Sequence, residues 1–273
     1  MKVTLKDGSF KEYDQPMSIY DIALDISEGL ARVACVGEID GEVKDLRTIV
    51  DKDCTLNILT FDSDEGKKAY RHTCAHVLAQ AVKNLYPDAK LTIGPAIDNG
   101  YYYDFDLPSL DRDALDAIEK EMKKIIKKGD RLERYTLSKD EAIKLMTERD
   151  EPYKVEMIKE HPDTDELSFY QQGDFIEFCA GPHLMSTKPI KAFKLTSSSG
   201  AYWRGDEHNK MLTRIYGTSF TKKADLEEYL NRMEEAKKRD HRKLGKELGL
   251  FMMHEAGPGF PFFLPKGMVL KNT

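Results

Sequence analysis

The stretch Arg71-His72-Thr73-Cys74-Ala75-His76 places two imidazoles four residues apart. On a helix this spacing puts both rings on one face, one turn from each other. A second stretch, Glu177-Phe178-Cys179-Ala180-Gly181-Pro182-His183, sets a thiol and an imidazole four residues apart. Its Gly-Pro step disfavours a continuous helix, so we expect a strand that runs into a turn. If the two stretches meet, three imidazoles and one thiol can bind a metal or activate a water molecule.

Spacing alone leaves two interpretations of these stretches open. A His-x-x-x-His pair on a helix is more often structural than functional, and a lone cysteine is usually a small buried hydrophobe. Thr73 stands where zinc proteases of the His-Glu-x-x-His type have their glutamate, which argues against that class. A structural metal-binding module and a water-activating site are therefore both alternatives.

The composition describes a folded protein with an acidic balance. A chain of 273 residues is long enough for two domains, and 40% hydrophobic with 33% charged residues is typical of globular proteins. The 42 basic and 48 acidic residues give a net charge of −6. This balance argues against a general DNA-coating protein, because phosphate binding relies on Lys and Arg. A nucleic acid bound by a local basic surface stays compatible with it.

Cysteine usage and the absence of apolar runs predict a cytoplasmic protein. The four cysteines, Cys35, Cys54, Cys74 and Cys179, include no Cys-x-x-Cys pair, so we expect reduced thiols and no disulfide framework. The N-terminus lacks the apolar core of a signal peptide, and no apolar run approaches the length of a membrane span.

The pattern of strands and helices predicts an α+β protein that starts with a small domain over residues 1–61. Asp7-Gly8 marks a tight turn between two alternating strands, and Ser18 can cap a short helix. Further strands are expected over residues 31–36 and 56–61. A hairpin, a helix and further strands in so short a segment are typical of a ubiquitin-like β-grasp domain.

A larger α+β domain is expected over residues 62–222. A helix over residues 67–86 carries His72 and His76, and a strand over residues 174–178 leads to Cys179. Other expected features are a helix over residues 111–128, a capping box at Ser138-x-x-Glu141, a break at 151–155 and a flexible segment at 196–200.

The C-terminal part is predicted to be a long helix followed by the start of another domain. The helix is expected over residues 224–248, within a linker that spans 223–249. Its basic run at residues 237–243 fits a solvent-facing surface or an RNA contact. Residues 250–273 are apolar and rich in Pro and Gly, and we expect them to begin a further domain that is cut short.

The motifs of the chain resemble those of bacterial threonyl-tRNA synthetases, over essentially its whole length and in the N-terminal part of that family. The matching stretches are His72-Thr73-Cys74-Ala75-His76, Ile93-Gly94-Pro95, Asp98-Asn99-Gly100-Tyr101-Tyr102-Tyr103-Asp104, Cys179-x-Gly181-Pro182-His183, Gly200-Ala201-Tyr202-Trp203-Arg204-Gly205-Asp206, Arg214-Ile215-Tyr216-Gly217 and Lys238-Arg239-Asp240-His241-Arg242-Lys243. The resemblance implies a TGS domain over 1–61, an editing domain of the threonyl/alanyl type over 62–222, and a linker to a class II catalytic domain that begins at 250–273.

The implied reaction is editing, the hydrolysis of the ester in seryl-tRNA(Thr) by attack of water. A site that selects threonine rejects the smaller serine by only about 1–3 kcal/mol, so a second pocket that excludes the extra methyl group supplies the remaining discrimination. Such a pocket must position a water, assist proton transfer and stabilise an oxyanion. With no synthetase active site expected in the chain, we expect no aminoacylation by it.

The resemblance also implies the residues of the editing site. Those expected to be catalytic are His72, Lys154, His76 and Cys179, and those expected to bind substrate are His183, Glu177, Tyr103 and Gly94. His72 is expected to position water or transfer a proton, and Lys154 to support the developing charge. Cys179 and His183 are expected to bind substrate or to orient the water. Glu177 departs from the family, in which Asp is frequent, and it carries the carboxylate on a longer arm.

No cofactor is expected for editing. The related alanyl domain holds zinc with a similar set, so zinc on His72, His76, Cys179 and His183 is the alternative. ATP and the synthetase zinc are expected only in the missing domain. The expected partner is tRNA(Thr) carrying serine, with no membrane and no DNA, and the full-length protein is expected to be a homodimer. A zinc-stabilised module and a tRNA-docking module, each without deacylase activity, are the competing functions.

Overall fold

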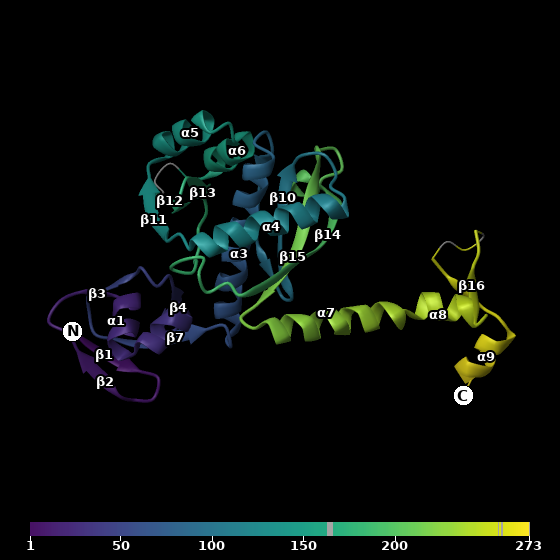
Figure 1. Ribbon diagram of the computed structural model, residues 1–273, viewed down its shortest axis with the longest axis horizontal. Coiled ribbons are helices and arrows are strands. Elements are labelled where there is room, and N and C mark those ends of the chain that lie inside the picture. Colours follow the sequence, from purple (N-terminus) through teal and green to yellow (C-terminus); the bar gives the residue numbers. More distant parts are fainter. Residues whose placement is uncertain (163–165, 256, 258, 273) are drawn as a thin grey trace. The chain divides into compact units, whose positions relative to one another are not determined.

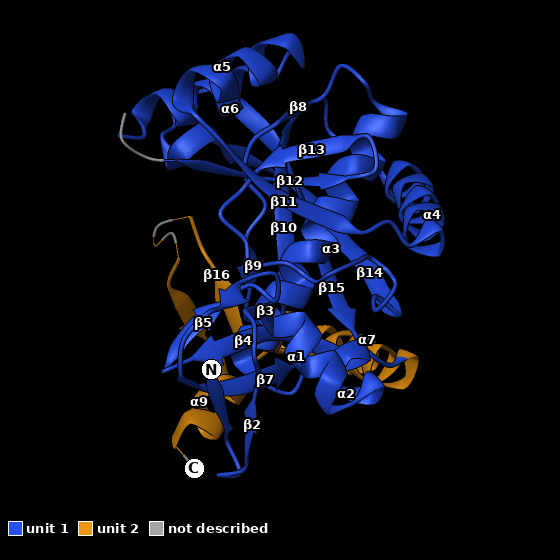
Figure 2. Cartoon of the chain, turned by 90° about the vertical axis from the view of Figure 1, so that its left-hand side faces the viewer, with its two compact units in different colours: residues 1–222 blue, residues 223–273 orange. Residues whose placement is uncertain are grey.

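The computed structural model describes residues 1–162, 166–255, 257 and 259–272 (Figure 1). Positions 163–165 of the predicted editing domain and positions 256, 258 and 273 of the predicted C-terminal segment lie outside the described residues. The chain forms two compact units, residues 1–222 and residues 223–273, which Figure 2 colours separately.

Unit 1 begins with a mixed five-stranded sheet in the order β2-β1-β7-β4-β5. Strands β1 and β7 run parallel, and the other pairs are antiparallel. The Ser18 side chain accepts a hydrogen bond from Asp21 N at 3.1 Å, so the expected helix cap is present. The elements are β1 (Lys2–Leu5), β2 (Phe10–Glu12), β3 (Met17–Ser18), α1 (Ile19–Ile26), α2 (Glu28–Val33), β4 (Ala34–Ile39), β5 (Glu42–Lys44), β6 (Ile49–Val50) and β7 (Cys54–Thr60).

The strand expected over residues 31–36 is wrong in its first half. Residues 31–33 end helix α2, whose first turn is capped by the Ser27 side chain through Leu30 N at 3.1 Å. Strand β4 starts only at Ala34. A serine cap three residues before Leu30 outweighs the preference of the following apolar residues for a strand.

The rest of unit 1 holds two antiparallel sheets, β14-β15-β10-β8 with β9 paired to β10, and β11-β12-β13. Helices α3 and α4 pack against each other, and both contact the sheet that contains β14, β15 and β10. The elements are α3 (Asp64–Leu85), β8 (Lys90–Leu91), β9 (Ala96–Ile97), β10 (Gly100–Asp106), α4 (Arg112–Lys128), β11 (Leu132–Leu137), α5 (Lys139–Glu148), α6 (Pro152–Glu160), β12 (Leu167–Gln172), β13 (Phe175–Phe178), β14 (Ala192–Tyr202), the 3₁₀ turn η1 (Trp203–Gly205) and β15 (Met211–Phe220).

Two expectations for this region are wrong. The segment at 151–155 is no break, because Pro152 opens helix α6, where its missing N–H is one that a helix start leaves unpaired anyway. The segment at 196–200 is no flexible loop, because it pairs with β15 inside the long strand β14. The capping box of α5 is confirmed: Ser138 and Glu141 bond to each other's backbone N–H.

Unit 2 contains α7 (Lys223–Lys238), α8 (His241–Glu247), β16 (Phe251–Met253), β17 (Pro261–Phe263) and α9 (Pro265–Asn272). The single helix predicted over 224–248 is therefore wrong. The chain leaves helical geometry at Asp240, whose carboxylate accepts Arg242 N at 2.8 Å and starts α8 instead. Strands β16 and β17 form a short antiparallel hairpin. Among the described residues, no helix is both long and apolar enough to cross a bilayer.

Candidate functional site

Helix α3 presents His72 and His76 side by side, with ring centroids 5.3 Å apart. The helix is central to unit 1, and its side chains from Thr73 to Ala79 are buried. His76 is buried, while His72 is partly exposed. The i, i+4 spacing therefore gives one edge of a site, as the sequence pattern predicts.

The second half of the site is the loop that follows β13. Cys179 leaves the strand, Gly181 and Pro182 are joined by a cis peptide bond, and His183 follows fully buried. Gly181 has a φ of +74°, and a Cβ there would lie 2.2 Å from the Tyr170 Oη. Only glycine fits both the left-handed backbone and this close approach.

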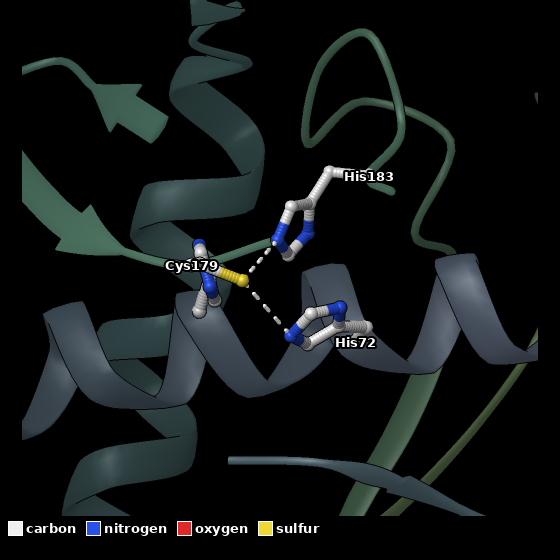
Figure 3. A group of neighbouring side chains, drawn as sticks. His72, Cys179 and His183 are labelled. Carbon is white, nitrogen blue, oxygen red and sulfur yellow. Dashed lines mark hydrogen bonds between the residues drawn. The ribbon is translucent and has the colours of Figure 1, made fainter. Parts of the chain in front are cut away.

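The two halves meet. The Cys179 Sγ lies 3.3 Å from His72 Nε2 and 3.3 Å from His183 Nε2 (Figure 3). The ring centroids of His183 and His76 lie 3.9 Å apart, with the ring planes tilted by 45°. The potential ligand atoms of His72, His76, Cys179 and His183 all lie within 4.8 Å of one another. Three imidazoles and a thiol are a donor set that Zn²⁺ takes, so these residues fit the metal of the alternative interpretation.

Thr73 sets the tautomer of His183. Its hydroxyl donates to the Ala69 carbonyl at 2.8 Å and accepts from Leu184 N at 3.0 Å. The hydroxyl has a single proton, so toward His183 Nδ1, 3.3 Å away, it can only accept. His183 therefore carries its proton on Nδ1 and turns the lone pair of Nε2 toward Cys179.

Burial keeps the three imidazoles and the thiol uncharged at neutral pH. Desolvation lowers the pKa of His72 to about 3, with the neighbouring His76 adding to the effect, and it also lowers the pKa of His76 to about 3. The pKa of His183 is lowered in the same way. Desolvation raises the pKa of the Cys179 thiol to about 12. A neutral imidazole keeps a lone pair that accepts a proton, but a pKa of about 3 makes His72 and His76 weak bases at neutral pH. The thiol, which stays protonated, is a poor nucleophile.

A buried ion pair is the other notable feature of the site. Lys154 from α6 and Glu177 from β13 are 3% and 2% exposed, and the ammonium group binds Glu177 Oε1. The Tyr103 hydroxyl donates to the same oxygen at 2.7 Å. Among the described residues, no hydrogen-bond donor reaches Glu177 Oε2, although it is buried. A buried carboxylate oxygen without a donor is a natural partner for a cationic ligand group.

One cavity of about 520 Å³ brings these groups together. Seven of the eight predicted site residues line it: His72, His76, Gly94, Tyr103, Lys154, Glu177 and Cys179. His183, the eighth, lies behind Cys179. A Cβ at Gly94 would lie 2.1 Å from the Tyr103 ring, so this glycine lets the backbone close over Tyr103.

Comparison with known proteins shows which families the chain is similar to. Residues 1–60 match the TGS domain, and residues 167–216 match the family described as "Threonyl and Alanyl tRNA synthetase second additional domain". The threonine--tRNA ligase of Acetivibrio thermocellus is 64% identical over 100% of this chain and 43% of its own length. Those of Clostridioides difficile and Caldanaerobacter subterraneus subsp. tengcongensis are 60% identical over 100% of this chain, and over 43% and 42% of their own lengths. The chain is related to bacterial threonine--tRNA ligases.

The family resemblance drawn from the motifs is thereby confirmed. The chain spans less than half of the length of these ligases. The α+β class is also confirmed, with a TGS domain and a domain of the editing type in one chain.

Sequence reasoning missed two residues of the site. Thr73 lies inside the first quoted stretch, and a hydroxyl between two histidines was the available signal. Asp45, from the TGS part, accepts a hydrogen bond from His183 N at 3.2 Å. No local pattern signals Asp45, because only the packing of distant segments brings it to the site.

Proposed function

We propose that this chain is an aminoacyl-tRNA deacylase that hydrolyses seryl-tRNA(Thr). The observation that carries the proposal is one cavity lined both by neutral histidines and by the buried Lys154–Glu177 pair, in which the second carboxylate oxygen of Glu177 has no hydrogen-bond donor among the described residues. The relationship to threonine--tRNA ligases supports the substrate, because serine is the smaller analogue that a threonine site rejects poorly.

The proposed chemistry uses His72 as the proton acceptor. The oxygen of a water attacks the ester carbonyl carbon while a water proton passes to the neutral imidazole. The bond between the carbonyl carbon and the ribose oxygen then breaks, serine leaves as the free acid, and the ribose oxygen takes up a proton. The ammonium of Lys154 stabilises the negative charge that develops on the carbonyl oxygen.

Substrate binding is assigned to the remaining wall of the cavity. Glu177 Oε2 is buried and has no hydrogen-bond donor among the described residues, so in this proposal it accepts a hydrogen bond from the ammonium group of the seryl moiety. Tyr103 and the Gly94 backbone pack closely together and limit the space for a larger side chain. A pocket without room for one more methyl group hydrolyses the serine ester and spares the threonine ester.

Single-turnover deacylation with the chain in excess tests this proposal. The wild-type chain should hydrolyse seryl-tRNA(Thr) much faster than threonyl-tRNA(Thr), and His72→Ala should lower the rate by about 100-fold or more. His208→Ala, at an exposed histidine, is the matched control. Equal hydrolysis of both esters would refute the size selection. Salt-sensitive tRNA binding without hydrolysis of either ester would favour a docking module instead.

A zinc-stabilised module is the second candidate, and the 4.8 Å clustering of four donor atoms favours it. His72, His76, Cys179 and His183 would hold the ion, which, when bound, supplies a Lewis acid and structural cross-linking. Stoichiometric zinc in the purified chain, with unfolding on chelation and no deacylation, would select this candidate.

A further inference from the structure

Two residues of the TGS part reach the backbone of the site. Asp45 and Arg47 lie in the loop between β5 and β6, and their side chains are only 9% and 14% exposed. They pair with each other, with Arg47 Nη1 at 2.9 Å and 3.1 Å from the two carboxylate oxygens. Side chains this deeply buried and mutually neutralised are held in fixed positions.

Arg47 acts as a fork on carbonyl groups of the other part of unit 1. Its Nε donates to the Leu132 carbonyl at 2.8 Å, and its Nη2 donates to the Leu184 carbonyl at 2.9 Å. Its Nη1 lies 3.4 Å from the His183 carbonyl oxygen. The planar guanidinium thus ties the start of β11 to the loop that carries His183.

Asp45 binds the same loop as a hydrogen-bond acceptor, whereas Arg47 binds it as a donor. Its Oδ2 accepts His183 N at 3.2 Å and the Tyr170 hydroxyl at 2.9 Å. The ring centroids of Tyr170 and His183 lie 4.5 Å apart. The Tyr170 hydroxyl also packs against Gly181, where a Cβ would lie 2.2 Å from its oxygen. Both the N–H and the C=O of His183 therefore face the Asp45–Arg47 pair.

We propose that Asp45 and Arg47 are positioning residues for the editing site, and that the TGS domain thereby organises the catalytic pocket. They do not line the cavity; they fix the peptide from which His183 reaches Cys179 at 3.3 Å. The predicted effect on catalysis rests on the proposed deacylase function, whereas the effect on the geometry of Cys179 does not. Residues that support a site from behind can matter greatly, because a misplacement of about 1 Å can cost about 100-fold in rate.

The variants must avoid leaving a single buried charge, which would unfold the chain for a trivial reason. The double variant Asp45→Asn/Arg47→Gln removes both charges together. Its matched control is Glu28→Gln/Arg32→Gln, an exposed acid–base pair of the same domain with its atoms 3.5 Å apart. Arg47→Lys keeps the charge but cannot bridge the Leu132 and Leu184 carbonyls, so it tests the fork geometry alone.

Three measurements on the whole chain decide the proposal: the single-turnover rate constant, tRNA affinity, and the rate at which N-ethylmaleimide alkylates Cys179, read by peptide mass spectrometry. The double variant should lose about 10–100-fold in rate with tRNA affinity unchanged. Alkylation of Cys179 should become several-fold faster as His183 moves away from the sulfur. Arg47→Lys should change both quantities in the same direction, and the exposed-pair control should change neither.

The outcomes separate this proposal from the proposed function. If the wild-type chain hydrolyses no ester, the deacylase assignment fails, and the alkylation rates still test whether Asp45 and Arg47 position the loop. If a folded double variant keeps the wild-type rate and the wild-type alkylation of Cys179, the positioning role is overturned. Should the double variant fail to fold, an Arg47→Lys variant with unchanged rate and alkylation overturns the role equally.

Discussion

At the scale of single residues, Thr73 links the helix half of the site to the loop half. One hydroxyl accepts Leu184 N and His183 Nδ1 while it donates to its own helix. It therefore fixes both the tautomer of an imidazole and the position of the backbone beside it.

Replacement of Thr73 by valine should expose this dependence. The variant keeps the shape of the side chain, but the backbone N–H of Leu184 and the ring Nδ1–H of His183 lose their acceptor, at a cost of about 1–3 kcal/mol in unfolding free energy. We expect the deacylation rate to fall about 10-fold or more, because the His183 tautomer is released. Chemical unfolding and single-turnover rates measure the two effects. Thr73→Ser, which keeps the hydroxyl, should retain most of both, and a valine variant with wild-type activity would contradict the argument.

The buried histidines also predict how stability depends on pH. Burial lowers the pKa of His76 from 6.5 to about 3. As the pH falls below 6.5, His76 takes up a proton in the unfolded chain, but in the folded chain it does so only at about pH 3. The free energy of unfolding therefore decreases as the pH falls from 6.5 to about 3. At about pH 5 this amounts to about 2 kcal/mol for this histidine. Urea unfolding of the chain in the presence of a chelator, at about pH 7 and about pH 5, measures this decrease.

The comparison with His76→Gln isolates that contribution. Glutamine does not titrate, so the variant should lose about 2 kcal/mol less than the wild type between the two pH values. His208→Gln, at an exposed position, should follow the wild-type curve. Identical pH dependence of His76→Gln and the wild type would show that His76 is not held neutral by the fold.

At the scale of elements, the sequence analysis predicted some local caps and missed others. The caps at Ser18 and at Ser138 with Glu141 appear as expected, because each involves only one turn of chain. Helix α6, strand pairing at 196–200 and the interruption at Asp240 were missed. Pro152 marks a helix start as readily as a helix end, and only pairing with β15 reveals that a Ser-rich segment is a strand.

Helix α6 matters because it carries Lys154 into the cavity. Lys154→Met should cost about 3–5 kcal/mol in stability, since it leaves the Glu177 carboxylate buried without its cation. It should also remove most deacylation. The double variant Lys154→Met/Glu177→Gln should regain stability without regaining activity, which separates the folding role of the pair from its chemical role. Lys159→Met, on the exposed side of the same helix, is the matched control. Full activity in the double variant would exclude both residues from the reaction.

At the scale of the whole molecule, the sequence pointed to the residues of the pocket but not to the framework that holds them. The His72/His76 spacing and the Cys179–His183 loop were visible as short motifs, and the family resemblance added Lys154, Glu177, Tyr103 and Gly94. Asp45 and Arg47 were not visible, because they act through backbone groups more than 80 residues away in the chain, such as the Leu132 carbonyl at a separation of 85. Contacts of this kind depend on how folded parts dock, and no sequence period encodes them.

The same framework bears on whether the site needs a metal. The two halves are joined by protein contacts, namely Thr73 to His183 and Leu184, and Asp45 to His183, so they should stay together without an ion. We therefore expect treatment with a chelator to leave both the thermal unfolding transition and the deacylation rate unchanged. Added Zn²⁺ should inhibit, because coordination takes the lone pair with which His72 accepts a proton, whereas Mg²⁺, which prefers oxygen ligands, should have no effect. Loss of activity on chelation, restored by one equivalent of zinc, would instead make the four-residue cluster a metal centre, in which the ion rather than His72 would activate the attacking water.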